Sequence, residues 1–251
     1  LRAGTEWGFH RLAGGRTAFV ADMGPPPPSR LASIGHASTL AFELSDGPER
    51  LIVNCGGGQG ATRRIPAELA DLLRTTAAHS TLVVGDVNST QLRADGTLGR
   101  GVEEVVANRQ ENENGSWVDG THDGYARRFG LSHCRRLFLS SDGMDLRGED
   151  TLLPTSGKRR RWTGATTPRF DIRFHLAPGV EVAQTADGKG ALLKTPGGRA
   201  WQLRFRGGEL SFDDSVFVGN DGVLRRARQI VLSGQADPGG TTVAWSLRKA
   251  G

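Results

Sequence analysis

The chain has 251 residues and a formal net charge of +5; 36 residues are glycine and 6% are aromatic. This length fits one large all-β domain or two ordinary domains. The positive balance weakly favours a polyanionic partner, which would be nucleic acid, an acidic polysaccharide or a membrane surface. No apolar run is long enough to cross a bilayer and no signal-peptide pattern is found, so we expect no membrane span.

Short segments with strand character follow one another along the chain, separated by turn signals. Asp-Gly and Gly-Gly pairs at 14–15, 46–47, 95–96, 187–188 and 221–222 supply the positive φ that tight hairpin turns need. This pattern favours an antiparallel sandwich over βαβ units, and we expect one all-β domain over 1–251. The expected strands lie within 1–12, 17–24, 39–45, 50–56, 79–87, 132–141, 170–176, 180–186, 190–195, 200–206, 210–218, 227–234 and 241–249.

Only one short helix is expected. In the segment 65–78, Pro66 stands near a first turn, and Leu69, Leu72 and Leu73 share one face. The segment leads directly into His79. The tetraproline at 25–28 predicts a stiff polyproline spacer.

Histidines are the first candidates for chemistry. His36 has the same parity as Leu40, Phe42 and Leu44, so it would point inward if the strand at 39–45 extended back to it. It would then be a core histidine with a partner or part of a site. His79 stands at the helix-to-strand junction, and His122 lies beside Asp123 and Tyr125. For each of these the ordinary interpretation is a satisfied core or turn histidine.

Other patterns carry weaker signals. Cys55 and Cys134 fit no metal spacing, and we expect free thiols. In the strand 169–176 the polar face carries two arginines, an aspartate and a histidine, which indicates either an anion site or a solvated face. The basic run at 158–162 is of a kind that contacts phosphates. It lies in a single expected loop, without aromatic residues interleaved along strands, so a nucleic-acid partner is not expected. Nucleophile-elbow and phosphate-loop motifs are absent.

Several motifs in a fixed order resemble the C-terminal domain of the heparinase II/III family of bacterial polysaccharide lyases. They are "GFHRL", "GRTAFVADMGPPPP", "GHASTLAFELS", "RLIVNCG", "LRTTAAHSTLVV", "HDGYARRFGLSHCRRLFLS" and "RFHLAPG". The resemblance implies a large antiparallel β-sandwich of the super-sandwich type. In the family this domain follows an α-helical toroid, which we expect to be absent from the residues 1–251, and the active site lies in the cleft between the two.

The resemblance also implies a reaction, β-elimination on a uronic-acid polysaccharide. A base removes the C5 proton, an acid protonates the departing oxygen, and a cationic or hydrogen-bonding group stabilises the added charge. A His/Tyr acid–base set in the toroid would do most of this work. We expect His36 to face the cleft as the catalytic residue from this domain. The expected substrate-binding or orienting residues are His79, Asn54, Tyr125, His122 and Arg74.

Two of these expectations leave an alternative open. Tyr125 is the only tyrosine in the chain and fits either a substrate contact or a buried hydroxyl anchor. Arg74 fits either a carboxylate contact or a residue that closes its loop.

Some members of the family hold a structural zinc, and this sequence departs from their ligand pattern. Ser38 and Asn54 stand where the second ligand and an aspartate would be, and neither is a good zinc ligand. We therefore expect no cofactor and no stable zinc site. The resemblance places the protein in the periplasm or cell envelope, acting on acidic polysaccharide. A non-catalytic carbohydrate-binding or scaffold module and a basic nucleic-acid-binding domain are the rival hypotheses.

Overall fold

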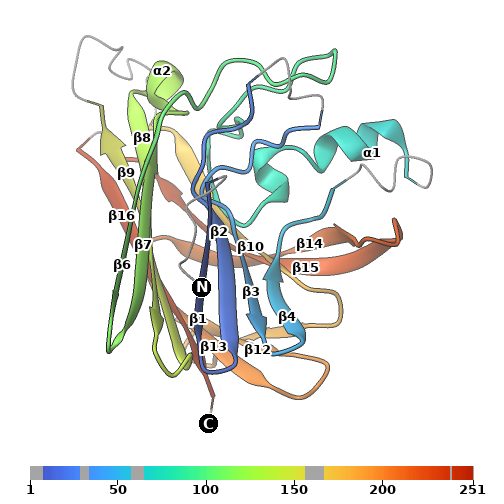
Figure 1. Ribbon diagram of the computed structural model, residues 1–251, viewed down its shortest axis with the longest axis vertical. Coiled ribbons are helices and arrows are strands. Elements are labelled where there is room, and N and C mark those ends of the chain that lie inside the picture. Colours follow the sequence, from blue (N-terminus) through green and yellow to red (C-terminus); the bar gives the residue numbers. More distant parts are fainter. Residues whose placement is uncertain (1–7, 29–33, 58–64, 156–166, 238, 251) are drawn as a thin grey trace.

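The computed structural model describes residues 8–28, 34–57, 65–155, 167–237 and 239–250, which form two antiparallel sheets packed face to face (Figure 1). The first sheet has the order β1-β2-β3-β4-β10-β15-β14, and β5 also pairs with β10. Its strands are β1 (Phe9–Gly14), β2 (Thr17–Asp22), β3 (Phe42–Asp46), β4 (Glu49–Val53), β5 (Leu82–Val84), β10 (Arg169–Leu176), β14 (Glu209–Val218) and β15 (Leu224–Gln235).

The second sheet has the order β11-β12-β13-β16-β9-β8-β7-β6. Its strands are β6 (Val105–Asn112), β7 (Gly115–His122), β8 (Leu131–Ser140), β9 (Asp145–Pro154), β11 (Glu181–Gln184), β12 (Gly190–Lys194), β13 (Ala200–Arg206) and β16 (Thr241–Lys249). The all-β sandwich expected from the turn signals is thus confirmed.

Side-chain alternation explains how the two sheets share a core. On β8 every second residue is buried, namely Leu131, His133, Arg135, Leu137 and Leu139, and the residues between these are half-buried or exposed. Phe42 of the first sheet stacks on Trp245 of the second, with ring centroids 5.6 Å apart. One apolar cluster therefore takes its members from both sheets.

The predicted hairpin turns are confirmed by the backbone. Gly15, Gly47, Gly188 and Gly222 all have positive φ, between 52° and 70°, and each lies between two paired strands. A residue with a Cβ atom would be strained in this region, so these glycines fix where the strands reverse.

Three strands escaped prediction because their sequences lack apolar alternation. β6 is a polar edge strand without a fully buried residue. β7 carries Gly115 and Gly120. On β9 two of the inward-facing positions are Gly148 and Asp150. A glycine or an aspartate at a core position hides the period of two from any sequence pattern.

The helical content also differs from the expectation. The predicted helix is present as α1 (Ala67–Leu72), followed by a 3-10 turn at Thr76–Ala78. Leu73 is buried but Leu72 is exposed, so the three leucines do not share one buried face. A second short helix, α2 (Ala126–Phe129), was not expected.

One end of the sandwich is built from segments far apart in the sequence. The β2–β3 connection, α1 with the 3-10 turn, and the segment after β5 all lie there (Figure 1). The Ala37 amide donates to the Arg74 carbonyl at 2.9 Å, and the Thr76 amide donates to Asn88 Oδ1 at 2.9 Å. This end therefore holds His36 and His79 side by side. None of the described helices is long and apolar enough to cross a membrane.

Candidate functional site

The loop that carries His36 begins with an unusual backbone conformation. β3 starts at Phe42, and Leu40 has a φ of 64°, in the left-handed region. The Leu40 amide donates to the Asp22 carbonyl at 2.7 Å, and the Ala41 amide to the Ser38 carbonyl at 2.8 Å. The resulting turn breaks the strand parity, so the strand does not extend back to His36, and the condition for an inward-pointing His36 on that strand is not met. Leu40 itself is fully buried, and its packing offsets the strain of this conformation.

His36 and His79 form a directed hydrogen bond. His79 Nδ1 lies 2.7 Å from the Thr75 carbonyl, which only accepts, so Nδ1 carries the proton. His79 Nε2 is then an acceptor, and His36 Nδ1 donates to it at 3.0 Å. The remaining nitrogen of His36, Nε2, is left with a lone pair. It lies near the exposed Gly57, where an added Cβ atom would stand 4.0 Å from it.

Both imidazoles are neutral at physiological pH. Burial, with a smaller contribution from the Arg74 guanidinium, lowers the pKa of His36 to about 4. Burial, followed by the charge of His36, lowers the pKa of His79 to about 3. His36 is half-buried, whereas His79 is only 4% exposed. The pair therefore presents a half-buried imidazole in a fixed tautomer, with the Nε2 lone pair of His36 not used in the hydrogen bonds just described.

Arg74 closes the loop on which His36 lies. Its Nε donates to the Gly35 carbonyl at 2.9 Å, and its Nη1 lies 3.8 Å from Asp71. The sequence left two roles open for Arg74, a carboxylate contact or closure of its loop, and these contacts are those of a residue that closes the loop. The same guanidinium also helps to keep His36 neutral, because a second positive charge disfavours the imidazolium.

Asn54 positions the chain that follows His79. Its Oδ1 accepts from the Ser80 amide at 2.9 Å, and its Nδ2 donates to Glu43 Oε1 at 3.2 Å. Ser80 Oγ in turn donates to the Val53 carbonyl at 2.7 Å. Asn54 therefore fixes the path of the backbone beside His79 through two side-chain hydrogen bonds.

The residues at the family's zinc positions do not fit a zinc ion here. Ser38 Oγ donates to Asp22 Oδ2 at 2.7 Å, and the Asn54 amide is used as described above. Among the residues that the structure describes, no group of three or more His, Cys, Asp or Glu side chains is arranged to hold a metal. A hydroxyl and a neutral amide are weak zinc ligands, so we derive no zinc-dependent step.

Asp22 is a carboxyl group that sequence reasoning missed. Burial raises its pKa to about 6, although Ser38 and the Gly24 amide donate to it. It lies at the end of β2, on the same loop as His36. A lone aspartate before a proline run gave no signal of this placement.

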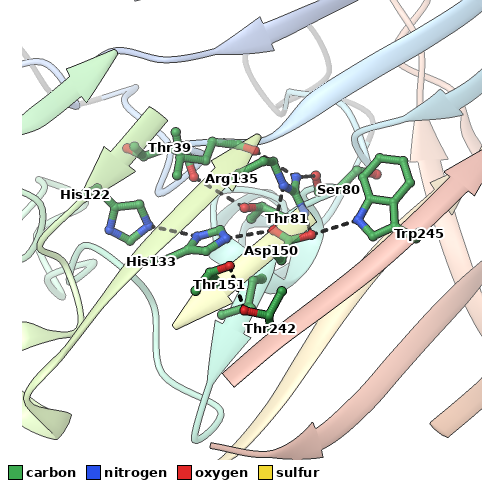
Figure 2. Close-up of polar contacts among 12 residues, drawn as sticks. Thr39, Ser80, Thr81, His122, His133, Arg135, Asp150, Thr151, Thr242 and Trp245 are labelled. Atoms are coloured by element: carbon green, nitrogen blue, oxygen red, sulfur yellow. Dashed lines mark hydrogen bonds and ion pairs between the residues drawn. The ribbon is translucent and has the colours of Figure 1, made fainter. Parts of the chain in front are cut away.

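A buried polar network lies behind the site, between the two sheets (Figure 2). Arg135 Nε donates to Asp150 Oδ1 at 2.7 Å and its Nη2 to Oδ2 at 3.1 Å. His133 Nε2 donates to Oδ1 at 2.8 Å, and Trp245 Nε1 to Oδ2 at 2.9 Å. The side chains of the three charged or titratable residues in this network are at most 1% exposed; they are Arg135, Asp150 and His133. Each of the two carboxylate oxygens of Asp150 thus accepts two hydrogen bonds, which compensate for the burial of its charge.

Arg135 connects this network to the two histidine-bearing segments. Its Nη1 donates to the carbonyl of Leu40 at 2.8 Å. The same Nη1 donates to the carbonyl of Ser80 at 2.7 Å (Figure 2). Leu40 forms the turn after His36, and Ser80 follows His79. A single guanidinium therefore holds both segments against the second sheet.

His122 and Tyr125 lie in the interior. The Gly124 amide donates to His122 Nδ1 at 3.0 Å, so His122 Nε2 carries the proton and donates to His133 Nδ1 at 3.3 Å. Tyr125 donates its hydroxyl to the Leu82 carbonyl at 2.8 Å, and burial raises its pKa. Each of these two side chains is only 1% exposed. Tyr125 is thus a buried hydroxyl anchor in this structure.

A second buried cluster lies near His79. His175 Nε2 donates to the Ala77 carbonyl at 2.9 Å, so its Nδ1 accepts from Ser215 Oγ at 2.8 Å. Cys55 Sγ lies 3.4 Å from the same nitrogen. Cys55 and Cys134 are both free, as predicted, and Cys134 is half-buried. Because His175 is buried while Arg169 is exposed, the polar face of β10 is not one continuous anion site.

Comparisons with known proteins agree with this fold. The family model described as "Heparinase II/III-like, C-terminal" matches residues 1–246, so the chain belongs to that family. A heparan sulfate lyase HepC mutant from Pedobacter heparinus superposes with a TM-score of 0.73 at 14% identity, covering 97% of this chain and 35% of the enzyme. A heparinase III, the BT4657 gene product with methylated lysines, gives 0.74 at 15% identity, covering 97% of this chain and 34% of that one.

A curated relative is more similar in sequence. "FtsZ-localized protein C" of Caulobacter vibrioides (strain NA1000 / CB15N) is 34% identical over an alignment of 256 residues, and the match covers 100% of this chain and 44% of the relative. The chain thus spans less than half the length of the curated relative it matches, and about a third of the heparinase chains.

The buried network generates a stability prediction. Asp150→Asn should lower the free energy of unfolding by about 3–5 kcal/mol, because it leaves the Arg135 charge buried without its partner. Denaturant unfolding of the variant and the wild type measures this. Asp214→Asn is the matched control, because that carboxylate is fully exposed and its removal should leave the midpoint unchanged. Equal midpoints for Asp150→Asn and the control would contradict the assignment.

The histidine pair generates a pH prediction. The folded-state pKa of His36 is about 4, below the ordinary value of 6.5, so its neutral form favours folding above pH 6.5. That contribution is lost as the pH falls from 6.5 through 4. In a proton NMR titration, the His36 ring signals should therefore not shift between pH 8 and pH 5, and His36→Gln should flatten the pH dependence of stability in this window. A His36 midpoint near 6.5 would contradict the proposed tautomer and burial.

Proposed function

We propose that this chain is the β-sandwich half of a lyase that cleaves a uronic-acid polysaccharide by β-elimination. The observation that carries the proposal is the His36–His79 pair, which gives a partly exposed, neutral imidazole with a free Nε2 lone pair. Membership of the heparinase II/III-like family supports this class of substrate. Access to such a polymer would place the protein in the periplasm or cell envelope.

In the reaction a base takes the C5 proton, whose electron pair forms the new C4–C5 double bond. The bond from C4 to the glycosidic oxygen breaks, and that oxygen receives a proton. A neutral His36 Nε2 would repel a carboxylate oxygen, because both carry lone pairs. We therefore assign His36 to support of the acid–base pair, accepting a hydrogen bond or a proton from the group that faces it.

His79 and Asn54 act as positioning residues in this proposal. His79 fixes the tautomer of His36 by accepting from its Nδ1, and would also stabilise the imidazolium if Nε2 took a proton. Asn54 holds the Ser80 backbone, and Arg74 holds the Gly35 carbonyl. His122 and Tyr125 are too deeply buried to be assigned to the binding face.

The remaining catalytic groups would come from an N-terminal α-toroid domain. The chains of the heparinase structures are about three times as long as this chain, so they have room for such a domain beside the sandwich. We therefore expect this chain to bind acidic polysaccharide weakly and to cleave nothing by itself.

The test compares two matched histidine variants of the protein that includes the toroid. His36→Gln should reduce turnover of a uronate polymer, followed by absorbance of the unsaturated product, by about 100-fold or more, since acid–base positioning contributes that much. The midpoint of thermal unfolding should change little. His10→Gln, on β1 and outside the proposed site, should keep its turnover. Unchanged turnover in His36→Gln, or a loss no larger than the loss of stability, would sink the proposal.

A second candidate is a non-catalytic scaffold or carbohydrate-binding module. The observation that favours it is the 34% identity, over the whole chain, to a protein named for its localisation with FtsZ. In that case the sandwich would serve binding alone, and His36 would be a structural residue of its loop.

Localisation separates the two candidates. For the lyase we expect a fluorescently tagged protein in its own bacterium to be distributed around the cell envelope, and FtsZ depletion should leave that pattern unchanged. A catalytically silent protein that gathers at the division site and disperses when FtsZ is depleted would support the scaffold instead.

A further inference from the structure

We propose that the outer face of the second sheet carries a second binding groove for acidic polysaccharide, separate from His36. The choice of polysaccharide as the occupant rests on the proposed function. Arginine and aromatic side chains of the second sheet line the groove itself.

One row of directly opposed residues crosses five strands of this sheet. In order from β7 to β13 the residues are Trp117, Phe138, Arg147, Ser246 and Arg204. Neighbouring strands lie roughly 4.8 Å apart, so Arg147 and Arg204 are separated by roughly 10 Å of sheet. Residues in such a row project from the same face.

The next row along the strands repeats the pattern. Arg136 of β8 opposes Glu149 of β9, which opposes Ala244 of β16, and Ala244 opposes Arg206 of β13. The small residues Ala244 and Ser246 therefore lie on the central strand, with arginines on either side. A groove of about 480 Å³ runs over this part of the sheet. Its shape follows from short side chains in the middle and long ones at both edges.

The side chains that line the groove carry a net positive charge. Five arginines and one glutamate line it, Arg248 being the fifth arginine and Glu149 the only acid. Arg136 and Arg206 are exposed and have no carboxylate partner among the described residues. Arg147 and Arg248 pair with Asp145, and Arg204 pairs with Asp187, but these pairs are solvent-exposed on the arginine side. Exposed pairs contribute little stability, so a ligand carboxylate or sulfate can replace them.

The aromatic rings at the groove pack against each other and against an arginine, so they do not offer open faces for stacking. The rings of Trp117 and Phe138 pack against each other with centroids 4.6 Å apart. The guanidinium of Arg147 lies 5.6 Å from the centroid of the Phe138 ring. Single-stranded nucleic acid binds by stacking bases on open aromatic faces, and here those faces contact one another or an arginine. The arrangement instead fixes guanidinium groups for planar recognition of carboxylate or sulfate.

The experiment measures binding of a defined heparin oligosaccharide to the purified protein by calorimetry at several salt concentrations. The double variant Arg136→Gln/Arg206→Gln should bind at least tenfold more weakly, with a shallower salt dependence, and keep the wild-type unfolding midpoint. Both side chains are exposed, so the fold should not depend on them. Arg226→Gln, at an exposed arginine on β15 of the first sheet, should bind as the wild type does.

Backbone amide shifts induced by the oligosaccharide should map to β8, β9 and β13. Wild-type affinity in the double variant overturns the groove, whatever His36→Gln does to turnover. Equal loss of binding to an oligothymidylate of matched charge overturns the polysaccharide assignment. If the groove variants lose binding while His36→Gln keeps turnover, the groove stands and the proposed catalytic role of His36 fails.

Discussion

The buried contact between Asp150 and Arg135 is the interaction on which the rest of the structure depends. Burial would raise the pKa of Asp150, but the Arg135 charge and the His133 hydrogen bond outweigh it and hold that pKa well below its usual range. Two ions taken out of water are stable only when every donor and acceptor is satisfied. Four donors converge on the two oxygens of Asp150, and they come from β8 and β16 (Figure 2). The pair therefore joins three adjacent strands of the second sheet inside the core.

The guanidinium of Arg135 also connects the second sheet to segments that pack on it from the first sheet. Because Arg135 binds the carbonyls of Leu40 and Ser80, the left-handed turn at Leu40 and the backbone after His79 have fixed positions relative to β8. The geometry of the His36–His79 pair is thus set by an ion pair that never meets solvent. This is a positioning effect, since neither Arg135 nor Asp150 touches the Nε2 nitrogen of His36.

Sequence patterns predicted the strands whose core positions are apolar and failed where the core is polar. β13 and β16 have their predicted limits, because Trp201, Leu203, Trp245 and Leu247 alternate with polar residues. β9 was missed because Asp150 occupies an inward position. The proximity of His36 and His79 followed from family resemblance, since 43 residues separate them. The positive φ of Leu40 and the raised pKa of Asp22 depend on tertiary contacts that no local pattern contains.

The hydrogen bonds around Ser38 and Asn54 explain how this loop keeps its shape with poor metal ligands. Ser38 ties the loop to Asp22 on β2, and Asn54 ties the His79 segment to Glu43 on β3. In family members with zinc, one ion would gather these segments at a single point. Here separate hydrogen bonds join the same segments in pairs, and Arg135 of the second sheet binds the backbone carbonyls of Leu40 and Ser80. In a site held this way the imidazole of His36 stays neutral because of its burial and the nearby guanidinium of Arg74.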